Sequence, residues 1–159
     1  MQLSASIFKA YDIRGIVPAT INEEVAEAQE VVDLFAADGV YHNTPFQAQT
    51  GPVELAAYWA RIELQRDISL RYEVLAETAT ETATETTTSG VAHWHVEYQV
   101  ASEELFKIWA ASTGTGLPDR QPGDPLPRLI LDGMMTAEFT AEGLCREARI
   151  WWHSMADTR

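Results

Sequence analysis

The stretch from Asp132 to His153, DGMMTAEFTAEGLCREARIWWH, decides the fold. It contains two apolar runs of strand length on either side of Thr140-Ala141-Glu142-Gly143, a short turn segment with glycine at its end. Runs of this length around a glycine-containing turn predict a β-hairpin. The second run closes on Trp151 and Trp152, whose ring surface has to be buried somewhere. The hairpin therefore predicts a sheet with a large aromatic face, and it indicates an architecture better than it indicates a reaction.

The first half of the chain shows two helical patterns around a strand. Residues 22–36 carry apolar side chains at helical spacing with acidic residues in the first turn, which predicts an amphipathic helix. Asp38-Gly39 is expected to end this helix, and residues 40–43 to begin a strand. A second helix is expected over residues 53–65, after the turn residues Thr50-Gly51-Pro52.

The remaining segments are richer in strands. Residues 70–76 and 91–100 each predict a strand, and the Thr-rich stretch 77–90 between them predicts a β-rich hairpin arm or a loop. Residues 101–110 fit either an extension of the second strand or a short helix, and residues 112–127 are rich in Gly and Pro and predict a loop. The order predicts an α+β fold with helices on one side of a curved antiparallel sheet.

Composition limits the classes of function. The chain has 159 residues, a net charge of −13 and one cysteine, Cys145. Such acidity repels phosphate backbones and anionic membrane surfaces, so we expect neither a nucleic-acid nor a membrane partner. A single cysteine allows no internal disulfide, and no apolar run approaches the length of a membrane helix, so we expect a cytoplasmic protein.

Three segments together carry a family resemblance: DLFAADGVYHNTPF, GPVELAAYW and LDGMMTAEFTAEGLCREARIWWH. In order and spacing they resemble the SnoaL-like branch of the nuclear-transport-factor-2-like superfamily, over about residues 24–155. The resemblance implies a cone-shaped α+β fold, with helices packed on the concave face of a bent sheet to enclose a pocket, and a domain spanning 24–159. Members are often homodimers and include isomerases, cyclases, epoxide hydrolases and dehydratases, besides proteins with no known reaction.

The N-terminus carries a second resemblance. IFKAYDIRGIV, residues 7–17, extending loosely to residue 26, is similar to the start of bacterial phosphomannomutases and phosphoglucomutases. That family also needs a phosphoserine and an Asp-rich magnesium loop, and neither pattern is present here. We therefore interpret residues 1–23 as a mutase-like segment that is not an independent domain, and we expect no mutase activity.

The superfamily resemblance also implies a set of pocket residues. By comparison with the steroid-isomerase pattern these are Tyr41, Asn43, Trp59, Trp94, Val96, Tyr98, Met135 and Trp152. Asn43 stands where those isomerases have their catalytic Asp, and Met135 stands where they have an acidic hydrogen-bond donor. An amide cannot abstract a proton and a thioether cannot donate a hydrogen bond, so the isomerase mechanism is not expected. The aromatic set suits either a pocket for a hydrophobic small molecule or a filled core.

Strand alternation predicts that the histidines do not face the pocket. His42, His93, His95 and His153 each neighbour a pocket-facing residue, so their side chains are expected on the opposite face. There they form either a polar face, in solvent or at a dimer interface, or part of a metal site; we expect no metal. If the parity is inverted, His93 and His95 line the pocket and become candidate general bases.

Two further residues carry side chains that could take part in chemistry. Asp132 is a candidate acid/base at the pocket rim, with Arg128 or Arg149 as its partner, or simply a carboxylate at a strand start. Cys145 has no recognisable relay and is expected to be inert. We expect no cofactor. The function is then either acid/base or water-mediated chemistry on a hydrophobic substrate, or non-catalytic ligand binding or dimerisation on the same fold.

Overall fold

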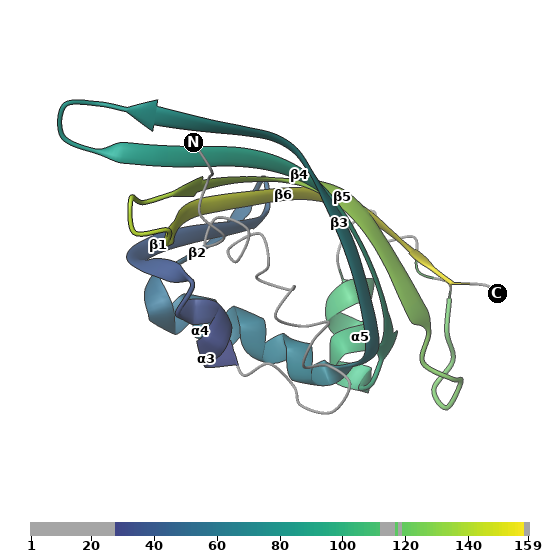
Figure 1. Ribbon diagram of the computed structural model, residues 1–159. Helices are drawn as coiled ribbons and strands as arrows, with labels where there is room; N and C mark the ends of the chain where they lie inside the picture. Colours follow the sequence, from purple (N-terminus) through teal and green to yellow (C-terminus); the bar gives the residue numbers. More distant parts are fainter. Residues whose placement is uncertain (1–27, 112–116, 118, 158–159) are drawn as a thin grey trace.

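The computed structural model describes residues 28–111, 117 and 119–157, and they form one curved sheet with helices on its concave side (Figure 1). The sheet has six strands in the order β2-β1-β6-β5-β4-β3. Their bounds are β1 Phe35–Thr44, β2 Gln47–Thr50, β3 Gln65–Glu81, β4 Thr86–Val100, β5 Arg128–Phe139 and β6 Cys145–Ala156. The helices are α3 Ala28–Val32, α4 Gly51–Trp59, the 3-10 helix η1 Ala60–Leu64 and α5 Glu103–Ala110. This is the α+β class that the sequence predicts.

The β5–β6 hairpin is confirmed with its turn. The two strands pair antiparallel, and Gly143 in the connection has a φ of +83°, a conformation that glycine adopts without strain. Gly133 lies between Trp94 on β4 and Trp152 on β6. A Cβ added at Gly133 would lie 2.2 Å from the Trp151 carbonyl oxygen and 2.9 Å from the Trp94 ring. Glycine at this position therefore leaves room for the Trp94 ring of β4 and for the backbone of β6 on either side of β5.

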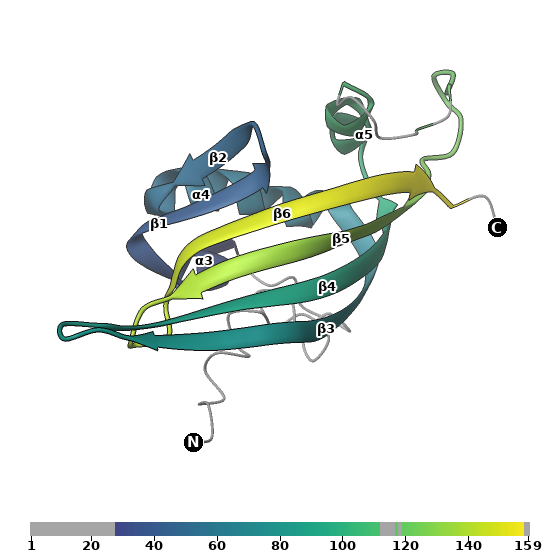
Figure 2. The same cartoon turned by 90° about the horizontal axis from the view of Figure 1, so that it is seen from above.

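The sheet is not purely antiparallel, which corrects the sequence prediction. β1 pairs with β6 in parallel, with Tyr41 opposite Ala148 and His42 opposite Arg149. β6 thus lies between its hairpin partner β5 and the much earlier strand β1 (Figure 2). No short turn connects strands that are this far apart in sequence, so no local sequence pattern predicts their pairing.

The boundary between the first helix and the first strand also differs from the prediction. Among the described residues the helix covers only 28–32, and β1 already begins at Phe35, within the predicted helix 22–36. Gly39 does not end a helix but lies inside β1. A Cβ there would meet the Ala36 carbonyl oxygen at 2.8 Å and the Cys145 carbonyl oxygen at 3.1 Å, so glycine permits the close approach of β1 to β6.

Three other predicted segments can be compared with the structure. The helix predicted over 53–65 runs from Gly51 through η1 to Leu64. The Thr-rich stretch is a hairpin arm, with β3 continuing to Glu81 and β4 beginning at Thr86, and it projects beyond the rest of the sheet (Figure 2). Residues 101–110 contain the helix α5, capped by the Ser102 hydroxyl, which accepts a hydrogen bond from the Leu105 N–H at 3.1 Å.

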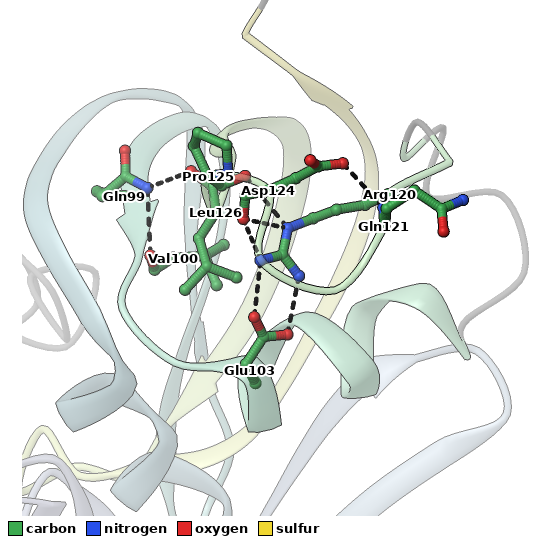
Figure 3. Close-up of polar contacts among 8 residues, drawn as sticks. All are labelled: Gln99, Val100, Glu103, Arg120, Gln121, Asp124, Pro125 and Leu126. Atoms are coloured by element: carbon green, nitrogen blue, oxygen red, sulfur yellow. Dashed lines mark hydrogen bonds and ion pairs between the residues drawn. The ribbon is translucent and has the colours of Figure 1, made fainter.

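The described segment that precedes β5 is held to α5 by Arg120. Arg120 donates two hydrogen bonds to the Glu103 carboxylate, at 2.7 and 2.8 Å, and further bonds to the Asp124 and Pro125 carbonyl oxygens (Figure 3). Its guanidinium also lies over the Phe106 ring, 5.1 Å from the centroid. Gln99 on β4 donates to the carbonyl oxygens of Leu126 and Pro127, which ties the residues just before β5 to the sheet.

The hydrophobic core lies between the concave face and the helices. Leu55 and Trp59 of α4 and Leu105 of α5 are buried there against the inward side chains of β1, β4, β5 and β6. None of the described helices is long and apolar enough to cross a membrane. The mutase-like segment lies outside the described residues.

Candidate functional site

Burial alternates strictly along β4 and sorts its side chains onto two faces. Trp94, Val96 and Tyr98 are buried on the concave face, at 7%, 1% and 1% exposure. His93 and His95, between them, lie on the convex face, where both bond Asp132. The side chains of β4 therefore point to the faces that the sequence predicts. The alternative, in which His93 and His95 line the pocket as general bases, does not occur.

Aromatic rings form two groups on the concave side. Tyr41 packs against Tyr58 and Trp59, with ring centroids 5.4 and 5.1 Å apart. Trp109 of α5 meets Trp152 of β6 edge-to-face at 4.9 Å. The first group joins β1 to α4 and the second joins β6 to α5, so each helix is fastened to the sheet by aromatic contacts.

All eight predicted pocket residues face this concave side. Six of them are buried and two, Met135 and Trp152, are half-buried and pack against the core; the buried six are Tyr41, Asn43, Trp59, Trp94, Val96 and Tyr98. They are not one contiguous cluster. Tyr41 and Trp59 touch each other, whereas Trp94 and Trp152 are brought together on either side of Gly133.

A group of three amides surrounds the buried Asn43. Its Nδ2 donates to Gln47 Oε1 and its Oδ1 accepts from Gln49 Nε2, both at 3.1 Å. Its backbone carbonyl accepts the Trp152 indole N–H at 2.9 Å. Gln49 Oε1 is buried and has no hydrogen-bond partner. We call Asn43, Gln47 and Gln49 the amide cluster. Sequence reasoning missed both glutamines, although Gln49 pairs with the inward-facing Tyr41.

Glu77 was missed as well. It pairs with Gly90, which places it on the concave face, and its Oε1 is buried without a hydrogen-bond partner. The strand register continues from Gly90 to Ala137 and from Ala137 to Ala148, so three small residues lie in a row beside it. One oxygen of the half-buried Glu77 carboxylate is thus shielded from solvent without a hydrogen-bond partner, which makes Glu77 a candidate acid/base group.

Asp132 does not lie at a pocket rim, which corrects the sequence prediction. It is on the convex face, where its carboxylate accepts from His93 Nε2 at 2.9 Å and from His95 Nδ1 at 3.0 Å. These hydrogen bonds, that to His93 first, hold the pKa of Asp132 below its usual range. Neither Arg128 nor Arg149 is its partner, since Arg128 pairs with Glu97 and Arg149 with Glu147. Among the described residues no group of three His, Cys, Asp or Glu side chains is arranged to hold a metal ion.

Solved structures resemble this chain in fold. A type-2 hexachlorocyclohexane dehydrochlorinase, LinA, matches with a TM-score of 0.62 at 7% identity, over 97% of this chain and 88% of the other. A candidate scytalone dehydratase from Novosphingobium aromaticivorans matches with a TM-score of 0.58 at 12% identity, over 97% and 84%. SalBIII, an epoxide hydrolase/cyclase-like enzyme of pyran ring formation in the polyether salinomycin, matches with a TM-score of 0.52 at 14% identity, over 91% of each chain. No family model and no curated protein sequence matches the chain.

The chain has a nuclear-transport-factor-2-like cone fold. At these identities the likeness concerns the arrangement of helices and strands, and the reactions named belong to those other proteins. The fold part of the superfamily resemblance is thereby confirmed. The resemblance of residues 7–26 to sugar mutases finds no counterpart among these structures.

The convex face of the cone carries a groove of about 280 Å³. Small, hydroxyl-bearing and charged residues line it: Ala76, Thr78, Ser89, Gly90, Val91, Thr136, Ala137, Glu138, Glu147 and Arg149. Glu147 accepts a hydrogen bond from Arg149, and its Oε1 lies 2.8 Å from His42 Nε2. The groove therefore lies on the face opposite the predicted pocket and shares no residue with it.

Cys145 is fully buried in the cone, at 0% exposure. Burial raises the pKa of its thiol to about 12, so almost no thiolate exists at neutral pH.

Proposed function

We propose that this protein binds a hydrophobic small molecule on the concave side of the cone, between the aromatic residues of the sheet and the amide cluster. The observation that carries the proposal is the buried Asn43, held by Gln47, Gln49 and Trp152 in an otherwise aromatic and aliphatic surface. A few placed polar groups in an apolar lining are typical of small-molecule sites. The unpartnered Gln49 oxygen supports the proposal, because a ligand hydroxyl or N–H would satisfy it.

Binding is supported better than the isomerase chemistry of the superfamily. At the position of the catalytic base the chain has Asn43, whose amide is already engaged at both ends, and Met135 offers no proton. An uncharged amide can orient a ligand but cannot take up a proton at neutral pH.

Native mass spectrometry of the purified full chain tests the proposal. We expect a retained small molecule, or a saturable 1:1 adduct with an aromatic probe such as 2-naphthol. Binding should weaken by about 10-fold in Gln49→Leu, because one hydrogen bond is lost, and should persist in the control Phe46→Ser, whose side chain is 95% exposed and lies outside the amide cluster. A clean apo protein with no saturable probe binding would contradict the proposal.

Glu77 favours a second candidate, acid/base turnover of the bound molecule. Its shielded Oε1, which has no hydrogen-bond partner, is the specific observation, because a general acid or base needs a carboxylate oxygen that can bond the ligand. Incubation of the recovered ligand with the protein, followed by mass spectrometry of the mixture, separates the two functions. Conversion by the wild type and not by Glu77→Gln supports catalysis; an unchanged ligand in both supports binding alone.

A further inference from the structure

The convex groove follows two neighbouring rows of side chains across the sheet. Strand pairing puts the following residues of β3, β4, β5 and β6 side by side: Thr78, Ser89, Glu138 and Glu147 in one row, and Ala76, Val91, Thr136 and Arg149 in the next. All eight line the groove. Because the residues on β3 and β4 are small, the face is hollowed there, whereas β6 contributes two long charged side chains. The groove thus has a small, partly hydroxylated end and a charged end.

The size of the groove limits its ligand. Its volume is about 280 Å³. A cavity of about 150 Å³ holds a benzene molecule, so this groove has room for roughly a dozen non-hydrogen atoms. That is less than most drug-sized ligands occupy, and it is far more than a single ion fills.

Two carboxylates lie directly opposite each other at the charged end. Glu138 on β5 pairs with Glu147 on β6, an arrangement that holds the two Cβ atoms about 5 Å apart. Like charges at directly opposite positions of two strands repel each other and destabilise the pair. A cation bound between the two carboxylates would remove this repulsion.

The cations of the chain near this pair are already engaged. Arg149 donates to Glu147. Arg146, whose guanidinium is also influenced by the charge of Glu138, donates to Glu85 in the hairpin arm. In the part of the chain that the structure describes, no salt bridge or side-chain hydrogen bond engages Glu138. Two carboxylates and one guanidinium line the groove, so one negative charge remains for a ligand to neutralise.

The rest of the lining specifies what the cation is attached to. The hydroxyls of Thr78, Ser89 and Thr136 can each donate and accept a hydrogen bond, which suits ligand hydroxyls. Ala76 and Val91 add apolar contact for carbon atoms. An ammonium group has three donors, enough for both carboxylates and one hydroxyl. A bare metal ion would use the carboxylates alone and leave the remaining lining without a partner.

We propose that the convex groove binds a small hydroxylated amine of about the size of an amino sugar. Its ammonium group lies between Glu138 and Glu147, and its hydroxyls bond the threonine and serine side chains at the other end. This site goes beyond the proposed function, because it lies on the opposite face of the sheet and takes a polar, cationic ligand instead of a hydrophobic one.

An NMR titration of the ¹⁵N-labelled full chain with D-glucosamine near pH 6.5 tests the proposal. We expect saturable shifts of the Ser89, Thr136 and Glu138 amides, with a dissociation constant below about 1 mM. D-glucose has a hydroxyl where glucosamine has its ammonium, so it should bind at least about 10-fold more weakly.

Three variants locate the ligand. Glu138→Gln keeps the size of the side chain and removes its charge, so glucosamine binding should weaken by about 10-fold or more. Thr136→Phe fills the groove and should abolish binding, while its amide spectrum shows that the chain is folded. Glu73→Gln is the matched control, since Glu73 pairs with His93 on the same face but does not line the groove. Binding of 2-naphthol should be unchanged in Glu138→Gln, which separates this site from the proposed concave one.

Four results would overturn the proposal. Glucosamine and glucose might bind equally, which would show a site for neutral sugars. Glu73→Gln might weaken binding as much as Glu138→Gln, which would show general attraction to an acidic protein. Equimolar Ca²⁺ might displace glucosamine, which would show a metal site. Absence of saturable shifts at 10 mM glucosamine would show that the groove takes no such ligand.

Discussion

The Trp152 indole donates to the backbone carbonyl of Asn43 across 2.9 Å, joining two residues 109 positions apart. The bond fastens β6 to β1 on the concave side, where Trp109 also packs on the Trp152 ring. The Trp152 side chain therefore links α5, the sheet and the amide cluster.

Replacing Trp152 by Phe should lower the free energy of unfolding by about 1 to 3 kcal/mol, because it leaves the Asn43 carbonyl without its donor. Urea unfolding at fixed protein concentration measures the effect. Trp109→Phe is the control, since it removes an indole from the same ring pair without breaking a hydrogen bond recorded for the described residues. Equal losses in both variants would show that ring packing and not the hydrogen bond is responsible.

Ser102→Ala should destabilise the protein by about 1 kcal/mol, because the Leu105 N–H loses its cap at the start of α5. Thermal unfolding compares it with Ser102→Asp, which restores an acceptor at the same position. A Ser102→Asp variant no more stable than Ser102→Ala would count against a capping role.

Gly133→Ala should destabilise the protein by about 2 kcal/mol or more, since its Cβ would collide with the Trp151 carbonyl oxygen. Gly123→Ala is the comparison. Gly123 has a φ of +95° but no atom within 4 Å of an added Cβ, so only local backbone strain arises. Chemical denaturation measures both, and similar losses would mean that space at Gly133 is not limiting.

Asp132→Asn should reduce stability only above acidic pH. The histidine hydrogen bonds lower the folded-state pKa of Asp132, so its contribution is present above the unfolded pKa of about 3.9 and is lost as pH falls through the lower folded value. Because the side chain is 55% exposed, we expect about 0.5 kcal/mol or less near pH 6. Urea unfolding of both proteins at pH 6 and near pH 2.5 checks this; a difference that grows at low pH would contradict it.

Cys145 should resist iodoacetamide at pH 8 in the native state, because burial raises the pKa of its thiol to about 12. Mass spectrometry should find one alkylation after denaturation in urea and none before. Rapid native labelling would mean that the β1–β6 edge opens far more often than the packing around Cys145 implies.

Sequence patterns predicted the fold where the signal is local. Gly143 marks the β5–β6 turn, and the alternation of tryptophan with histidine on β4 assigns both faces of that strand. Alternation along β5 already puts the side chains of Asp132 and Met135 on different faces of the sheet. The position of Asp132 away from the pocket rim therefore follows from the same rule.

What the sequence did not reveal depends on irregular or distant contacts. A register shift between Val74 and Ala76 reverses the parity of β3, which hides the inward direction of Glu77. Gly39 resembles a helix stop, but it is needed for the approach of β1 to the Cys145 backbone. The parallel pairing of β1 with β6 arises only when strands far apart in the chain meet.

The position of β6 between β1 and β5 has a consequence for synthesis. β6 is the latest of the six strands in sequence, yet it joins β1 and β2 to the other three. A ribosome-bound chain that has emerged only as far as Phe139 exposes the unpaired edges of β1 and β5. Such a nascent chain can pair with other chains through these edges until residues through Ala156 have left the exit tunnel.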